Sequence, residues 1–214
     1  MNNILQYPES TIVDSVIPKN AFYRKATVTQ RMKTRFVDEL QELRWLYKLA
    51  PQTLNIEGAK EIEEVQIFLA VLKQQTIPIE LLRFIDTVMP QFIVFILQYK
   101  NDYCLFCNYK HYATQAHDRC EISESFATEW SSDMPDLHIY GRTTAAIYDK
   151  FIRQIAGNRL EQAATIAEDI ATMQQKETIQ KRIEKLEILR SREQQPHKKF
   201  ELHQQIQRLK EDLK

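Results

Sequence analysis

The segment CLFCNYKHYATQAHDRC, residues 104–120, gathers residue types that bind zinc: Cys104, Cys107, His111, His117 and Cys120. A zinc site needs thiolates or imidazoles that converge as a tetrahedron, and a Cys-x-x-Cys pair provides two of them when it lies in a tight turn. Cys104 and Cys107 instead lie in an aromatic, alternating run typical of a strand, where residues three apart point to opposite faces. We therefore expect core thiols rather than a zinc site. A redox pair is not expected either, because no helix N-terminus follows to stabilise a thiolate.

Lys73 is the second residue whose position suggests chemistry. Metal-dependent nucleases place an acid and an acid-x-Lys motif on neighbouring strands, where carboxylates bind Mg²⁺ and the lysine stabilises the attacked phosphate. Lys73 ends the apolar run VQIFLAVLKQ, but Val71 occupies the position of the acid, and Glu63 and Glu64 lie at the other end of the run. An intact nuclease site is not expected, although a diverged nuclease-like fold stays open.

No other catalytic pattern is found. The chain has three glycines, too few for phosphate-binding loops, and it lacks a Walker loop, a dinucleotide fingerprint and a Ser/His/Asp arrangement. We expect no catalytic residue, no bound metal and no cofactor, and the balance of the sequence favours a protein that is not an enzyme.

The elements that would position these residues follow from hydrophobic periodicity. After Thr27 and Thr29, each a candidate N-cap, the apolar residues step by three and four and predict a helix: Met32, Phe36, Val37, Leu40 and Leu43. RWLYKLA, closed by Pro51, predicts a strand. In it Trp45 and Tyr47 alternate with Leu46 and Lys48, and we expect at least one of the two aromatics to pack in the core rather than stack on bases.

Two further runs, EVQIFLAVLKQ and QFIVFILQY, are apolar on both faces and predict central strands covered on both sides. The helix PIELLRFIDTVMP between them implies a parallel crossover, whereas the turn NDY before YCLFCNYKHY implies an antiparallel hairpin. CEISESFATEW predicts an edge-like strand, and TTAAIYDKFIRQIAG predicts a helix. Residues 1–158 are therefore expected to form an α/β (α+β) domain, with a mixed β-sheet of about four to five strands flanked by helices.

Residues 159–214 are expected to form an α-helical arm. Its apolar residues step by three and four in two runs typical of a coiled-coil seam: Ile179, Ile183, Leu186, Leu189, Leu202, Ile206, Leu209 and Leu213. Pro196 separates the runs, and a proline inside a helix costs roughly 3 kcal/mol. This predicts a coiled-coil-like helical hairpin over 177–214, in which Pro196 opens the second helix; one long kinked helix is the alternative. The irregular spacing from Met173 to Ile179 predicts a kink or a loop there.

A two-helix hairpin rarely stands alone in water, so its seam is expected to pack either on the globular domain or on another chain. Both interpretations stay open.

The charges balance at 29 basic and 29 acidic side chains, but they are unevenly distributed. Residues 19–48 carry eight basic and three acidic side chains, while residues 54–136 carry six basic and thirteen acidic ones. A DNA-binding role would use the first of these segments, and its candidate contacts are Arg31, Lys33, Arg35, Arg44 and Lys48. The other interpretation is a solvated surface attracted to the acidic middle of the same chain.

Several segments resemble a bacterial family described as a domain of unknown function. The resemblance is carried by IPKNAFYRK, ELRWLYKLAPQTLNI, EEVQIFLAVLKQ and REQQPHKKFELHQQIQRLKEDL, in this order over most of the chain. Members tend to be encoded beside helicases and DNA methyltransferases of restriction-like and phage-defence loci. The resemblance implies an accessory role in such a system and transfers no catalytic residue.

We therefore expect a non-catalytic accessory or protein-interaction subunit of a restriction-like or anti-phage defence system. Its arm would contact a helicase or methyltransferase of the same locus, or a second copy of the chain. The alternative is a diverged Mg²⁺-dependent nuclease-like or DNA-binding component. The N-terminus lacks the features of a signal peptide and QFIVFILQY is too short to cross a bilayer, so we expect a cytoplasmic location and no membrane contact.

Overall fold

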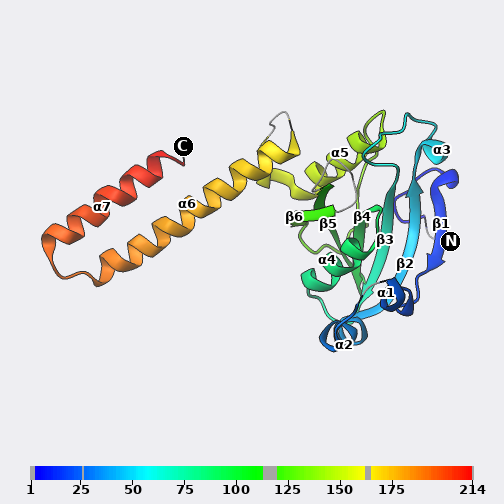
Figure 1. Ribbon diagram of the computed structural model, residues 1–214, viewed down its shortest axis with the longest axis horizontal. Coiled ribbons are helices and arrows are strands. Elements are labelled where there is room, and N and C mark those ends of the chain that lie inside the picture. Colours follow the sequence, from blue (N-terminus) through cyan, green and yellow to red (C-terminus); the bar gives the residue numbers. More distant parts are fainter. Residues whose placement is uncertain (1–2, 26, 113–119, 162–164, 214) are drawn as a thin grey trace. The chain divides into compact units, whose positions relative to one another are not determined.

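The computed structural model describes residues 3–25, 27–112, 120–161 and 165–213 (Figure 1). The chain forms two compact units, and the boundary between them lies between Gly157 and Asn158. The first unit, here called the body, contains the β-sheet, and the second, the arm, is helical. No helix in the described ranges combines the length and the apolar character needed to cross a membrane.

The body is built on one six-stranded sheet whose strands lie in chain order. They are β1 (Ile12–Val16), β2 (Leu40–Leu49), β3 (Val65–Leu72), β4 (Phe92–Tyr99), β5 (Asp102–Tyr112) and β6 (Cys120–Ala127). β3 and β4 are parallel, and all other neighbours are antiparallel. The sheet is mixed, as expected, but it has six strands rather than four to five. The strand missing from the prediction is β1, at one edge.

The irregular backbone of β1 explains why its sequence carries no alternating pattern. Its register with β2 shifts between Ile12 and Ser15, and Asp14 has a positive φ of 48°. A bulge of this kind puts two residues opposite one, so side chains no longer alternate between the faces of the sheet.

Helices cover both faces of the sheet. The longer ones are α1 (Asn20–Lys25), α2 (Gln30–Asp38), α4 (Ile79–Val88) and α5 (Thr144–Ala156), and the short ones are η1 (Glu9–Thr11) and α3 (Pro51–Leu54); a further short turn, η2 (Gly157–Arg159), lies at the boundary of the two units. Phe22 of α1, Phe36 of α2 and Ile85 of α4 share one buried cluster with Phe68 and Phe95 of the central strands.

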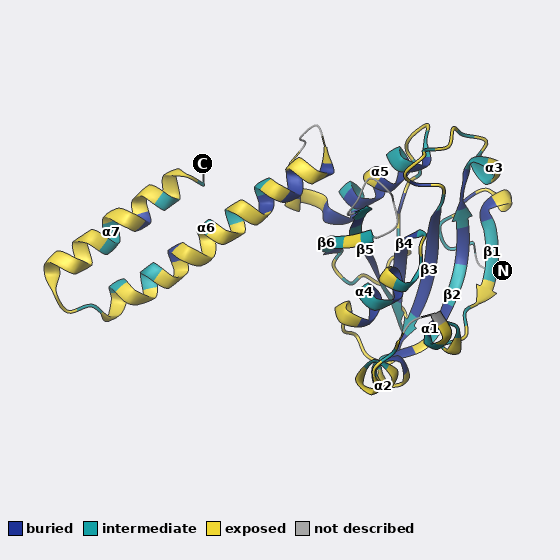
Figure 2. Ribbon diagram, in the orientation of Figure 1, coloured by how far each residue is buried: buried dark blue, intermediate teal, exposed yellow. Residues whose placement is uncertain are grey.

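The opposite face of the sheet is covered by α5. There Tyr148 packs against Phe92, with ring centroids 4.9 Å apart. β3 and β4 are buried along most of their length because the two helical layers enclose them (Figure 2). Both strands were predicted from their doubly apolar sequences, and the crossover helix α4 between them was predicted as well.

The helix predicted from Thr29 is shorter than expected. Thr29 is its N-cap, and its hydroxyl accepts the N–H of Met32 at 3.2 Å. α2 ends at Asp38, however, so Leu40 and Leu43 belong to β2, where both side chains are buried. The prediction extended the helix too far because Leu40 and Leu43 in β2 continue the three-and-four spacing of α2. They belong to the same core cluster as Phe36 of α2.

The arm consists of α6 (Ile166–Arg192) and α7 (Pro196–Glu211), which contact each other. Pro196 is in the first turn of α7, where its missing N–H has no intrahelical acceptor to lose. The chain therefore folds back at residues 193–195. The kink or loop expected between Met173 and Ile179 is absent, and α6 runs through this stretch without interruption. An irregular spacing of apolar residues does not interrupt a helix when the residues between Met173 and Ile179 are good helix formers.

Candidate functional site

The seam of the arm is buried most completely at its centre. Ile183 of α6 and Ile206 of α7 are buried, and a Glu187–Lys210 ion pair of 2.9 Å joins the two helices. The other seam residues are half-buried, except Leu189, which is exposed: Ile179, Leu186, Leu202, Leu209 and Leu213. The hairpin thus covers its own seam in the middle and leaves apolar surface towards the loop.

That apolar surface lies around residues 193–195. Ile188 and Leu189 in the last two turns of α6 are 51% and 54% exposed, and Phe200 near the start of α7 is 60% exposed. Figure 2 shows this end of the arm as mostly exposed. We call Ile188, Leu189 and Phe200 the apolar tip. Large exposed apolar side chains at one end of an element are candidates for protein contact.

Most of the basic residues considered for nucleic-acid contact already have acidic partners within the chain. Arg31 and Arg35 pair with Glu80 at 3.4 and 2.9 Å, and Arg35 also lies 3.4 Å from Glu39. Lys33 lies over the ring of Tyr23, 5.7 Å from its centroid.

The two basic residues of β2 are paired as well. Arg44 bridges Asp14 and Glu42, both at 2.9 Å, and Lys48 lies 2.8 Å from Glu64. These pairs attach the basic segment to neighbouring acids of the same fold, which leaves fewer unpaired charges to attract a phosphate backbone.

The two aromatic residues of β2 lie on different faces of the sheet. A register shift between Trp45 and Tyr47 places Trp45 opposite Phe68 and Tyr47 opposite Ile67. Tyr47 is buried against Tyr7, with ring centroids 5.0 Å apart. Trp45 is partly buried, and its indole N–H donates to the carbonyl of Tyr47 at 2.8 Å. The pair therefore does not form a joint stacking platform.

Lys73 is exposed at the end of β3, and within the described ranges no Asp or Glu oxygen forms an ion pair with its ammonium group. A metal-dependent nuclease would need at least two carboxylates at this position. The geometry around Lys73 therefore differs from that of such a site.

The two cysteines of β5 point to opposite faces of the sheet. Cys104 joins the core cluster under α4, whereas Cys107 pairs with Val94 on the face towards α5. Burial raises the pKa of both thiols, so neither is present as the thiolate that binds metal. In the part of the chain that is described, no group of three His, Cys, Asp or Glu side chains could hold a metal ion. His117 lies outside the described residues.

A buried polar chain that sequence reasoning missed connects α4 to β5 and β6. Lys110 and Asp86 are fully buried and lie 3.4 Å apart. The amide of Asn108 donates to Asp86 at 2.8 Å, and the hydroxyl of Ser125 donates to Asn108 at 2.8 Å. Arg83 in turn donates to that hydroxyl at 2.8 Å. Burial raises the pKa of Asp86 from 3.8 to about 6, against the opposing influence of Lys110 and Asn108.

The sequence does contain a signal for this pair. Asp86 follows Leu82 by four residues on the apolar face of α4, and Lys110 follows Cys104, Phe106 and Asn108 at the period-two spacing of a strand. Charged residues in such inward positions indicate a buried pair.

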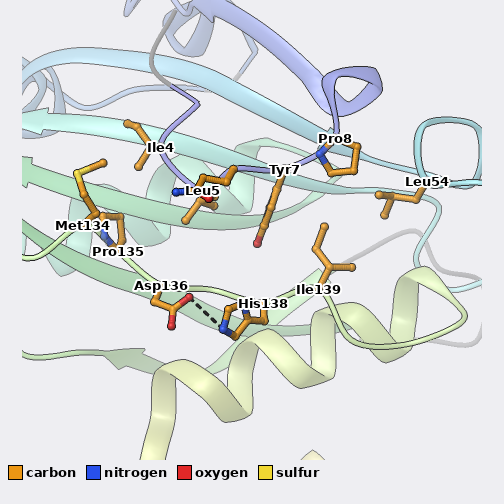
Figure 3. Close-up of a pocket in the computed structure, with 11 residues that line it drawn as sticks. Ile4, Leu5, Tyr7, Pro8, Leu54, Met134, Pro135, Asp136, His138 and Ile139 are labelled. Atoms are coloured by element: carbon orange, nitrogen blue, oxygen red, sulfur yellow. Dashed lines mark ion pairs between the residues drawn. The ribbon is translucent and has the colours of Figure 1, made fainter.

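A separate pocket of about 640 Å³ lies between the N-terminal segment and residues 134–139 (Figure 3). The hydroxyl of Tyr7 donates to the carbonyl of Leu137 at 2.6 Å and joins the two segments. Asp136 and His138 lie 3.2 Å apart at its rim and are both exposed. None of the lining residues is a serine, cysteine or threonine, and the hydroxyl of Tyr7 is bound to Leu137, so this pair has no free hydroxyl or thiol in the pocket to activate.

Comparison with known proteins gives one match. No curated protein and no solved structure matches the chain. The model of a family described as Domain of unknown function (DUF4391) matches residues 5–213, which span the body and the arm. The chain therefore belongs to this domain-of-unknown-function family.

Proposed function

We propose that this protein is a non-catalytic interaction subunit that binds a partner protein through the apolar tip of its arm. The observation that carries the proposal is the exposure of Ile188 and Leu189 in α6 and of Phe200 in α7, on the two sides of the connection at residues 193–195. Three large exposed apolar side chains at this end of the arm would bury apolar area against a partner, and burial of this kind is the main driving force of association.

The charges around the apolar tip favour a partner of opposite charge. Residues 185–200 contain five Lys or Arg (Lys185, Arg190, Arg192, Lys198 and Lys199) and two Glu, a balance of +3. Glu187 already pairs with Lys210 at 2.9 Å. Two copies of the chain meeting tip to tip would bring like charges together, which costs free energy. A partner surface that is apolar at its centre and acidic at its rim fits better than a second copy.

The resemblance described above supports a more specific partner. It implies a place beside helicases and DNA methyltransferases, so we propose that the partner is one of these two proteins in a restriction-like or anti-phage defence system. The chain would serve as its accessory subunit.

The proposal is tested by co-expression of the chain with a helicase and with a DNA methyltransferase of such a system. We expect one of them to co-purify with the wild-type chain and to be lost, by at least tenfold, from chains carrying Ile188→Glu or Phe200→Glu. Val37→Glu is the matched control, because Val37 is also 54% exposed but lies on α2, outside the arm. This control should retain the partner.

Two results would contradict the proposal. One is equal recovery of the partner by the wild-type chain and both tip variants. The other is retention of duplex DNA instead of either protein, with an affinity that falls steeply as salt is added, which would favour the DNA-binding alternative.

A further inference from the structure

A second pocket, of about 320 Å³, lies on the face of the sheet covered by α1 and α4. Three of its nine lining residues are aromatic: Trp45 and Phe68 are opposite each other on β2 and β3, and Phe22 of α1 contributes from above the sheet. A volume of this size accommodates a small organic molecule, and apolar and aromatic walls with a few polar groups are typical of ligand sites. The pocket shares no lining residue with the one in Figure 3.

One polar side chain in this pocket has an unused hydrogen-bond acceptor. Gln66 is only 3% exposed, and its amide N–H₂ donates to a carboxylate oxygen of Glu64. This contact fixes the amide orientation, because the reverse orientation would put two oxygens against each other. Within the described part of the chain, no donor reaches the amide oxygen of Gln66. Buried amide oxygens are rarely left unpaired, since losing water without a new donor is unfavourable.

The other polar groups of the pocket define what the missing donor can be. Glu64 is paired with Lys48 at 2.8 Å, so its charge is balanced and does not call for a cation. The indole N–H of Trp45 is bound to the carbonyl of Tyr47, so this residue offers the pocket only its ring. The pocket therefore presents apolar side chains, among them the partly exposed ring of Trp45, and carbonyl or carboxylate acceptors to a ligand.

We propose that this pocket binds a small, neutral aromatic heterocycle of nucleobase size that donates an N–H to the amide oxygen of Gln66. The ring packs on the partly exposed indole of Trp45, because flat aromatic surfaces attract each other. An amino group on the ring supplies the donor that Gln66 lacks and offers a second hydrogen to the neighbouring carboxylate of Glu64. A ring without that donor leaves the acceptor unpaired, which selects against it.

Titration calorimetry of the full-length chain with two matched compounds tests the proposal. The probes are 9-methyladenine and 9-methylpurine, which differ only in the exocyclic amino group. We expect 9-methyladenine to bind at least tenfold more tightly. Adenosine monophosphate distinguishes a nucleotide ligand from a free base. Affinity equal to that of 9-methyladenine assigns the pocket to a nucleotide, whereas tenfold weaker binding assigns it to a free base.

Gln66→Leu removes the acceptor while keeping a side chain of similar size, and we expect it to abolish the preference for 9-methyladenine. Gln98→Leu, on β4 and outside the lining of the pocket, is the matched control and should keep that preference. The proposal is overturned if neither compound binds the wild-type chain at millimolar concentration, if both bind equally, or if Gln66→Leu retains the preference. The comparison of the two compounds on the wild-type chain stands even if Gln66→Leu does not fold.

Discussion

Lys110 illustrates how a buried charge can be fully partnered in this fold. Its ammonium group has three N–H bonds, and it donates to the three main-chain carbonyls of Asp86, Met89 and Gln91. The carbonyls at the end of a helix have no intrahelical donor, and α4 ends at Val88. Lys110 therefore caps α4 and holds the turn that leads into β4. Met89 and Gln91 in this turn also line the pocket of Gln66, so Lys110 supports the pocket wall.

Replacement of this lysine should be costly. We expect Lys110→Met to lower the free energy of unfolding by about 3–5 kcal/mol, because Asp86 and three buried carbonyls would lose their donor. Urea denaturation of the full-length chain measures the change. Lys73→Met is the control: Lys73 is an exposed lysine at the end of β3, and its loss should change stability by less than about 0.5 kcal/mol. Equal effects of the two substitutions would contradict the assigned role.

The raised pKa of Asp86 predicts that the stability of the fold depends on pH. Its pKa is raised from 3.8 to about 6 in the folded chain, so the folded state binds a proton more tightly than the unfolded state does. The resulting stabilisation is fully present below pH 3.8 and is lost as the pH rises through 6. Compared with Asp86→Asn, which cannot titrate, the wild-type chain should lose roughly 3 kcal/mol of stability between pH 4 and 7. Urea denaturation of both chains across this range gives the difference, and a constant difference would contradict the prediction.

At the scale of elements, the sequence predicts those whose pattern is independent of distant partners. β3 and β4 are apolar throughout, and α4 lies between two prolines, so each is recognisable from its own residues. β1 and the end of α2 depend on tertiary pairing instead. β1 extends next to β2 with a bulge, and Leu40 pairs with Leu72 across the sheet rather than continuing a helix.

The candidate sites were predicted to different degrees for the same reason. The seam residues of the arm lie close together in sequence, so spacing alone placed Ile183 and Ile206 on the faces that meet. The Gln66 pocket combines residues from β2, β3, α1 and the turn after α4. No local pattern indicates that Trp45 and Met89 line one cavity.

The two helices of the arm provide an element-scale prediction. Ile206→Ala removes a fully buried side chain from α7 and should destabilise the hairpin by about 2–5 kcal/mol. Because two helices alone bury little apolar surface, this loss should open α7, and its amide hydrogens should exchange with solvent at nearly unprotected rates. Hydrogen exchange of the full-length chain measures this. Leu189→Ala, at a seam position that is exposed, should leave the protection of α7 unchanged, and equal loss in both variants would argue against a buried hairpin seam.

At the scale of the whole molecule, the two proposed binding sites belong to different units. The apolar tip lies in the arm, and the Gln66 pocket lies in the body. In the body, strands enclosed by helices form a substantial core, whereas the described part of the hairpin at residues 177–213 buries few residues (Figure 2). A rigid pocket suits a small ligand, since little ordering is needed on binding, and a thin helical arm suits a protein partner because much of its surface is accessible.

This division predicts that the two functions can be lost one at a time. In the full-length chain, Phe200→Glu should reduce partner co-purification at least tenfold and leave the affinity for 9-methyladenine within twofold of wild type. Gln66→Leu should have the opposite pattern. Calorimetry and co-purification applied to both variants give four measurements, and denaturation midpoints close to wild type exclude loss of folding as the cause. A variant that weakens both activities while remaining folded would show that the pocket and the tip are energetically coupled, and the two units could then no longer be treated as independent binding sites.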